Sequence, residues 1–114
     1  MRSDSGDLLQ GTLAILILKA LLTGSVHGYG VARWIEETTD DVLRVEEGSL
    51  YPALRRLEDR GWVKSEWGLS ENNRRARFYT ITAAGRTHLR GEAALWMRYS
   101  AAVAQVIRAE PSLA

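Results

Sequence analysis

Two short polar segments of the sequence carry the side chains with the clearest binding chemistry. Both combine hydroxyl, amide or guanidinium groups with few large apolar neighbours. Their members are Ser49, Tyr51, Pro52, Arg55 and Arg56 in the first segment, and Asn72, Asn73, Arg74, Arg75 and Arg77 in the second. Guanidinium groups bind anionic oxygens through paired hydrogen bonds, and hydroxyl and amide groups can bond to the same acceptors. The two segments therefore predict a surface that binds a polyanion.

The sequence shows no arrangement of side chains that is typical of a catalytic or metal centre. It contains no cysteine, which excludes disulfides, thiolate metal sites and a cysteine nucleophile. The two histidines, His27 and His88, are far apart, and neither belongs to a cluster with metal-ligand spacing. Gly28-Tyr29-Gly30 is no phosphate loop, because the Lys-Ser/Thr end is missing. We therefore predict no enzyme activity, no metal and no cofactor, and expect His27 to pack or hydrogen-bond where a helix begins.

The 114-residue chain has the composition of one globular domain, with 46% hydrophobic and 25% charged residues. Its net charge of +1 hides an asymmetry between the two halves. Residues 1–50 carry eight acids and four bases, whereas residues 51–114 carry eleven bases and six acids. The second half, which holds the arginines of both polar segments, is therefore the part expected to face a polyanion.

Residues 8–22 form the most apolar stretch of the chain. Three polar side chains interrupt it, and it is shorter than the roughly 20 apolar residues that a membrane span needs. The residues before it include Asp4 and Asp7 but no basic cluster, which argues against a signal peptide. We expect a soluble, cytoplasmic protein with no membrane partner.

Apolar periodicity predicts two helices and a short strand in the first half of the chain. The first helix spans residues 7–22 and is apolar on several sides, so more than one of its faces should be buried. The second begins at Gly28-Tyr29-Gly30. Apolar and charged residues then alternate over residues 42–45, which predicts a minor strand.

The two polar segments fall on a third helix and on a hairpin. We expect the helix to start at an N-cap on Ser49, to hold Pro52 in its first turn and to run to about Arg60, with Gly61 as its C-cap residue. Alternating sequences at residues 62–67 and 77–82 predict an antiparallel hairpin with a polar loop between them. The first segment thus lies at the start of the helix, and the second lies at the tip of the hairpin.

A last helix is predicted over residues 83–108, with Thr82 as its N-cap. Such a helix spans roughly 39 Å, which is longer than this small body needs. Its apolar stripe cannot all pack on the body, and an exposed stripe of that size usually marks an interface, here a homodimer. Trp96 on this stripe is either ordinary interface core or one wall of a pocket for a planar aromatic ligand.

The order of these elements predicts a mainly α (α+β) fold, a winged helix-turn-helix with a long C-terminal dimerisation helix. The winged domain would span residues 7–82 and the dimerisation helix residues 83–108, with flexible tails at 1–6 and 109–114. In such folds the third helix enters the DNA major groove with its N-terminal part. Residues 55–77 carry seven bases against four acids, a modest footprint that a two-fold dimer doubles.

Each part of this interface also has an interpretation without DNA. Tyr51 can pack against the wing, Arg55 and Arg56 can form a solvated helix face, and a basic loop can serve solubility alone. For the whole chain, the alternatives are a winged-helix module that binds another protein and a small-molecule sensor that does not bind DNA. The helix and the wing together favour DNA, and a steep salt dependence of duplex binding would distinguish DNA binding from both alternatives.

Several motifs resemble the PadR family of bacterial transcriptional regulators. They are Leu9-Gln10-Gly11-Thr12-Leu13, His27-Gly28-Tyr29-Gly30, Gly48-Ser49-Leu50-Tyr51-Pro52-Ala53-Leu54, Arg56-Leu57-Glu58, Gly61-Trp62, Glu66-Trp67 and Tyr79-x-Ile81-Thr82-x-x-Gly85. The resemblance runs from residue 7 to about residue 100 and is to the small subclass with a single C-terminal helix. It implies a homodimer that binds double-stranded DNA at an inverted-repeat operator and usually represses. Several members release DNA when a small phenolic or other aromatic effector binds near the dimer interface.

The resemblance also implies which residues act. The DNA-contacting region of the family corresponds to Ser49, Tyr51, Pro52 and residues 72–75. Effector pockets in the family use the first and last helices. The residues expected at the dimer interface or effector pocket are Leu9, Leu13, Leu89, Ala93, Trp96, Tyr99, Val103 and Ile107.

Overall fold

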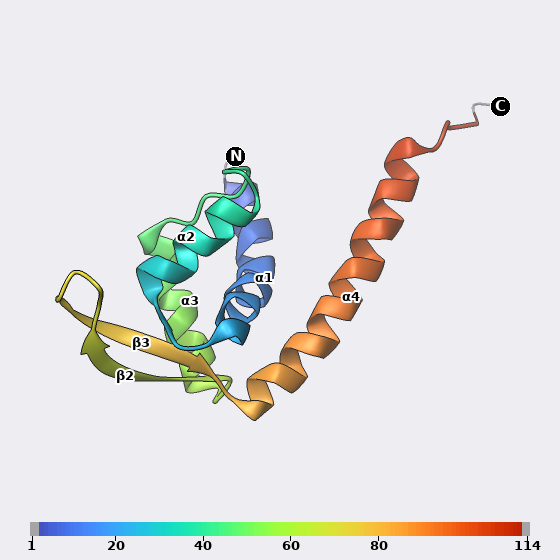
Figure 1. Ribbon diagram of the computed structural model, residues 1–114. Helices are drawn as coiled ribbons and strands as arrows, with labels where there is room; N and C mark the ends of the chain where they lie inside the picture. The colour runs from blue at the N-terminus through green and yellow to red at the C-terminus, as the bar shows by residue number, and fades with distance from the viewer. Residues whose placement is uncertain (1–2, 113–114) are drawn as a thin grey trace.

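The computed structural model describes the backbone of residues 3–112 and the side chains of residues 12–112. It contains helices α1, α2, α3 and α4, a short 3-10 helix η1, and a sheet of strands β1, β2 and β3. In chain order their bounds are α1 Ser3–Ala20, η1 Leu21–Thr23, β1 Val26–His27, α2 Gly28–Thr38, α3 Glu47–Asp59, β2 Val63–Leu69, β3 Arg75–Ile81 and α4 Ala83–Arg108. Within the described residues, this arrangement confirms the predicted winged helix-turn-helix with a long C-terminal helix (Figure 1).

The core lies where α1, α2 and α3 meet the sheet. Leu13, Ile17 and Leu18 of α1 are almost fully buried, as expected for a helix that is apolar on several sides. Leu50 and Leu54 of α3 pack into the same cluster. This core holds α3 in place and leaves its opposite side free.

The sheet is antiparallel, in the order β1-β3-β2. Val63 pairs with Ile81 across β2 and β3, and both side chains are buried on the face that meets the core. Because side chains alternate along a strand, Trp67 and its partner Arg77 extend the same face beyond the core. The hairpin β2-β3 is therefore a wing whose inner face continues the surface next to α3.

The predicted strand at residues 42–45 is wrong. Asp40 and Asp41 both have positive φ, 50° and 65°, and turn the chain sharply after α2. The backbone amides that a β-ladder would need are bonded to side chains instead. Leu43 N–H donates to the Thr39 hydroxyl, and Val45 N–H donates to the Glu36 carboxylate. The third strand is instead Val26–His27, which pairs with β3.

The start of α3 also differs from the prediction. The N-cap is Glu46, whose carbonyl accepts from the amides of Ser49 and Leu50, so Ser49 lies inside the first turn. Pro52 consequently lies in the second turn, where its missing N–H leaves the exposed Gly48 without a helical donor for its carbonyl. The end of α3 is as predicted, because Gly61 takes a positive φ of 79° directly after the helix.

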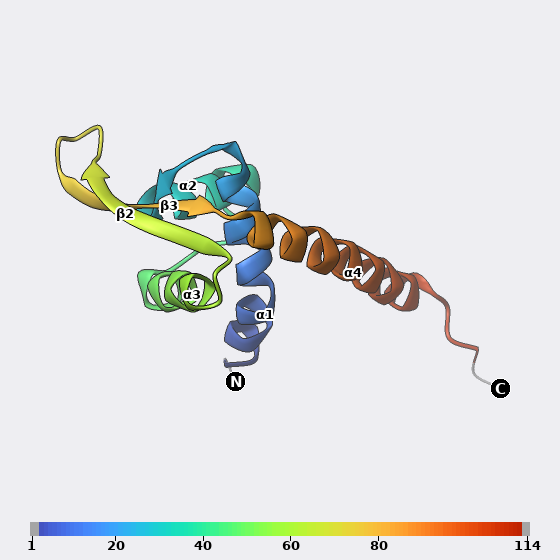
Figure 2. The same cartoon turned by 90° about the horizontal axis from the view of Figure 1, so that it is seen from below.

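Helix α4 has the predicted bounds and begins with the predicted cap, since the Thr82 hydroxyl accepts from the Gly85 amide. His88 stacks on Trp62 with the ring centroids 3.5 Å apart. Beyond Ala93 the helix projects away from the body (Figures 1 and 2). The molecule is accordingly elongated, with extents of 65 × 28 × 23 Å.

Two residues expected at the dimer interface or effector pocket belong to the core instead. Leu13 is 1% exposed and Leu89 is 6% exposed, because both lie where α1 and the first turns of α4 pack on the body. Leu9 lies outside the residues whose side chains are described. The helix also starts earlier than expected, at Ser3.

Gly85 makes the close packing of α4 on the body possible. A Cβ atom there would collide with the Trp62 carbonyl oxygen and come within 2.9 Å of Ile81 Cγ1. We expect Gly85→Ala to lower the free energy of unfolding by about 2 kcal/mol or more, because a backbone atom cannot move aside cheaply. Urea denaturation measures this loss.

Gly91 is the matched control on the same helix, since a Cβ there meets nothing within 4 Å. Gly91→Ala should stabilise the protein by about 0.5–1 kcal/mol through better helix propensity. Equal effects of the two substitutions would contradict the close packing of α4 on the body at Gly85.

Candidate nucleic-acid interface

The outward face of α3 is defined by what the helix buries. Its core side chains are Leu50, Ala53, Leu54 and Leu57. At 3.6 residues per turn, Gly48, Pro52, Arg55 and Asp59 lie on the opposite side, and all four are exposed. Arg55 brings the hydrogen-bond donors of this face and is therefore the predicted site residue best placed to meet base edges.

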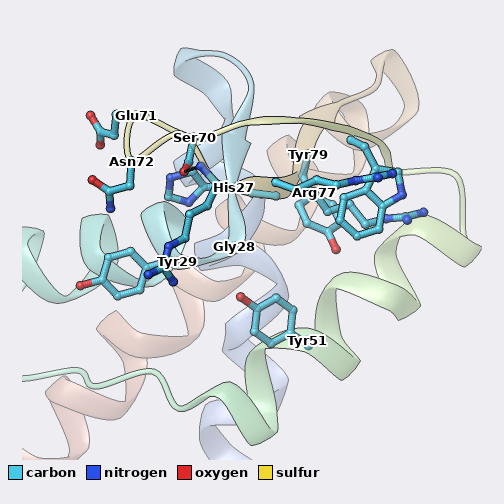
Figure 3. Close-up of a pocket in the computed structure, with 13 residues that line it drawn as sticks. His27, Gly28, Tyr29, Tyr51, Ser70, Glu71, Asn72, Arg77 and Tyr79 are labelled. Atoms are coloured by element: carbon cyan, nitrogen blue, oxygen red, sulfur yellow. Dashed lines mark hydrogen bonds between the residues drawn. The ribbon is translucent and has the colours of Figure 1, made fainter.

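Tyr51 lies on the flank of α3 that faces the wing. Its ring lies over Gly28 at the start of α2, where a Cβ atom would come within 2.8 Å of Tyr51 Cε1 (Figure 3). Burial, and next the charge of Glu47, raise the pKa of Tyr51 above its ordinary value of 10.0. The hydroxyl thus stays protonated at neutral pH and can donate to a phosphate.

The start of α2 is held by the predicted histidine. His27 caps the helix, since its Nδ1 accepts from the Gly30 amide at 2.9 Å. The His27 ring also meets Phe78 of β3 edge to face. His27 therefore fixes α2 against the wing and supports the position of Tyr51.

Arg56 and Ser49 lie on the other flank of α3, seven residues apart and so on the same side. Arg56 lines a hollow of about 210 Å³ together with Ala14, Arg60 and Trp62. The structure therefore places these two predicted residues away from the wing, whereas Tyr51 and Arg55 lie on the wing side and the outward side.

A groove of about 670 Å³, here called the wing groove, brings Tyr51 together with predicted residues of the wing. It lies between the wing, the start of α2 and Tyr51 (Figure 3). Its lining includes the predicted residues Tyr51, Asn72, Arg74, Arg75 and Arg77. The groove holds three guanidinium groups and a neutral tyrosine hydroxyl against one carboxylate, Glu71, so it suits a segment of phosphate backbone.

Asn73 at the wing tip has a structural role in the turn. It takes a positive φ of 60°, and its backbone N–H donates to the Ser70 carbonyl at 2.8 Å. The Ser70 amide in turn donates to the Arg74 carbonyl. These bonds close the loop at residues 70–74 and present Arg74 at its edge.

The three wing arginines are not equivalent. Arg77 Nε donates to the Ser65 hydroxyl at 2.9 Å, and Arg77 Nη2 lies 3.8 Å from Glu58 Oε2 of α3. Among residues 12–112, neither Arg74 nor Arg75 has a carboxylate within 4 Å. Arg74 and Arg75 are therefore available for phosphate, whereas Arg77 is already engaged.

Sequence reasoning missed three residues of this site. The guanidinium groups of Arg75 and Arg77 both lie over the Trp67 ring, 4.7 Å and 5.3 Å from its centroid. Ser65 and Glu58 hold Arg77. The contacts of Trp67 and Ser65 follow from the strand register, which pairs Trp67 with Arg77 and Ser65 with Tyr79. Those of Glu58 follow from the packing of α3 against the wing, and the sequence shows neither.

The described residues contain no group of three or more His, Cys, Asp or Glu side chains that could hold a metal ion. In the same part of the chain, no helix combines the length and the apolarity that a membrane crossing requires.

Comparison with known proteins agrees with this geometry. The model of the transcriptional regulator PadR-like family matches residues 17–91. The chain belongs to this family. Its members are transcriptional regulators that bind DNA, and they are not enzymes.

Solved structures of transcriptional regulators share this fold. A transcriptional regulator from Clostridium thermocellum is 28% identical, with a TM-score of 0.80 over 90% of this chain and 99% of that chain. A PadR family regulator from Eggerthella lenta is 29% identical, with a TM-score of 0.74 over 95% of this chain and 92% of that chain. The negative transcriptional regulator PadR of Bacillus subtilis is 25% identical. The matched segment covers 68% of this chain and 42% of that protein.

Arg55 and Arg56 provide a test of the geometry of α3, because they carry equal charge on different sides. We expect Arg55→Ala to weaken binding to a specific operator by about 10- to 100-fold, the cost of a lost base contact, and to weaken binding to unrelated duplex much less. Arg56→Ala should weaken both by similar, smaller factors. Fluorescence anisotropy on the two duplexes measures this, and equal losses for Arg55→Ala would show that it contacts only phosphate.

Proposed function

We propose that the protein is a homodimeric repressor that binds an inverted-repeat operator in the cytoplasm. The observation that carries this proposal is the placement of Arg55 on the outward face of α3 next to a wing groove lined by Arg74 and Arg75. This arrangement suits entry of α3 into the major groove while the wing holds the neighbouring phosphates. The negative regulator of Bacillus subtilis among the relatives supports repression as the direction of control.

The outer part of α4 supports a homodimer. Its exposed large apolar side chains are Leu95, Trp96, Met97, Tyr99, Val103, Val106 and Ile107. Trp96, Val103 and Ile107 share one side of the helix by their spacing, and Ala93 is half-buried at its inner end. A second copy of α4 would cover this side and would set two α3 helices about one DNA turn apart.

Selection of bound duplexes from a random pool tests both parts of the proposal. The protein should select two inverted half-sites with centres about 10 base pairs apart. Val103→Glu should make the protein monomeric and weaken binding of the selected site by at least ten-fold, because a carboxylate would be buried against its symmetry mate.

Ala101→Glu is the control for this experiment, since it adds the same charge to an exposed position on the other side of α4. It should leave the dimer and its operator intact. Selection of a lone half-site by a monomeric wild-type protein would refute the dimer.

We also propose that a planar aromatic effector binds beside Trp96. A hollow of about 210 Å³ lies between α1 and α4, lined by Ile15, Glu92, Leu95, Trp96 and Tyr99. Two aromatic rings and two aliphatic side chains suit a flat apolar ligand, and a symmetry mate across α4 would deepen the site.

Tryptophan fluorescence tests this effector site. Planar phenolic compounds should quench the emission of the wild-type protein, and Trp96→Ala should abolish most of that response. Trp34→Phe is the control, because Trp34 is similarly exposed on α2, far along the chain from α4. Quenching that survives in Trp96→Ala but not in Trp34→Phe would place the ligand elsewhere.

A further inference from the structure

We infer that Glu58, Ser65 and Arg77 form a polar strut that sets the angle between α3 and the wing, and that Arg77 is a positioning residue rather than a phosphate contact. This inference rests on the proposed operator binding. It assigns the three wing arginines two different tasks.

The strut is a set of contacts that joins three elements, α3, β2 and β3. The Ser65 hydroxyl of β2 donates to Glu58 Oε2 of α3 at 2.7 Å. Arg77 Nε of β3 donates to the same hydroxyl oxygen at 2.9 Å, and Arg77 Nη2 lies 3.8 Å from the same carboxylate oxygen. One carboxylate of α3 thus holds both strands of the wing.

The wing needs such support at this level. Strand β1 pairs with β3 at Phe78 and Tyr79, so the hairpin beyond Glu66 and Phe78 continues as two strands. A two-stranded hairpin is marginally stable by itself in water. The strut meets the hairpin where the third strand ends, which is the point where an unsupported wing would begin to bend.

Neighbouring side chains carry the effect toward the wing tip. Arg77 lies over the Trp67 ring, and Arg75 lies over the same ring. Tyr79 lies at the base of this group. Burial raises the pKa of Tyr79, Arg77 lowers it, and Glu58 and Tyr51 raise it. A displacement of Arg77 would therefore also displace Arg75, which is available for phosphate.

Electrostatics give the strut a second consequence. Glu58 lies seven residues after Tyr51 and so on the same flank of α3, next to the wing groove. A bare carboxylate there would repel DNA phosphate, whereas Arg77 neutralises it. The Arg77 side chain is 43% exposed and the Glu58 side chain 35% exposed, so the direct contribution of the pair to folding is small and its value is geometric.

A double-mutant cycle on operator binding tests the inference. Arg77→Ala should weaken operator binding by about five-fold or more, because it leaves the Glu58 charge uncovered and frees the wing. In the Glu58→Gln background the same substitution should cost at least about three-fold less. Multiplicative losses would overturn the strut.

Salt dependence separates a positioning role from a phosphate contact. Loss of one phosphate contact lowers the slope of log K against log salt by about 0.9. We expect that drop for Arg74→Ala, which serves as the matched control, and little change in slope for Arg77→Ala. Arg77→Lys keeps a charge beside Glu58 but loses the Nε donor to Ser65, so it should recover only part of the affinity that Arg77→Ala loses; a lysine variant with full affinity and unchanged slope would overturn the inference.

Hydrogen exchange of the wing amides without DNA keeps this test independent of the proposed function. Arg77→Ala, Glu58→Gln and the double variant should all speed exchange of residues 63–77 to a similar extent. Unchanged exchange in all three would overturn the strut even if the operator binds. Absence of salt-dependent binding of any duplex by the wild-type protein would refute the proposed function, while the exchange result would still decide the strut.

Discussion

The corner where the hairpin meets α4 determines the geometry of the rest of the molecule. The Thr82 hydroxyl donates to the Gly61 carbonyl at 2.7 Å and accepts from the Gly85 amide at 3.0 Å. The Thr82 amide donates to the Trp62 carbonyl at 3.0 Å. One residue thereby ties the end of α3, the last strand and the first turn of α4. Because Gly85 has no side chain, α4 lies directly on the Trp62 carbonyl, and the direction in which it leaves the body is set there.

Two parts of the chain extend from this body in different directions, the wing on one side and α4 on the other (Figure 1). Each has few neighbours along its outer half, but their surfaces differ. The outer wing carries guanidinium groups, whereas outer α4 carries apolar side chains such as Trp96 and Ile107. A polyanion complements the first surface and an apolar helix face complements the second. The body therefore connects two surfaces that need partners of opposite chemistry.

Local signals predicted the elements better than they predicted the task of each side chain. The bounds of α4 follow from its cap and its periodicity, and both signals are local. The strand expected at residues 42–45 failed because side-chain bonds to the amides of Leu43 and Val45 replace a ladder, which alternation does not reveal. The arginines of the site were found by type. The role of each arginine depends on the rotation of α3 and on the strand register, which arise only on packing. These decide that Arg55 faces outward, that Arg74 and Arg75 are available and that Arg77 is engaged.

The small number of available cations has a consequence for specificity. Among the described residues of the outward face of α3 and the wing groove, the guanidinium groups without a carboxylate within 4 Å are Arg55, Arg74 and Arg75. Because Arg55 faces the base edges, Arg74 and Arg75 remain for phosphate and give a slope of roughly two per chain, so charge alone holds DNA weakly at physiological salt. In the proposed dimer, discrimination among sequences would then depend on the base contacts of the two Arg55 side chains and on the distance between them, which α4 would set. A change that loosened the Thr82 corner would therefore impair recognition even though every DNA-facing side chain remained in place.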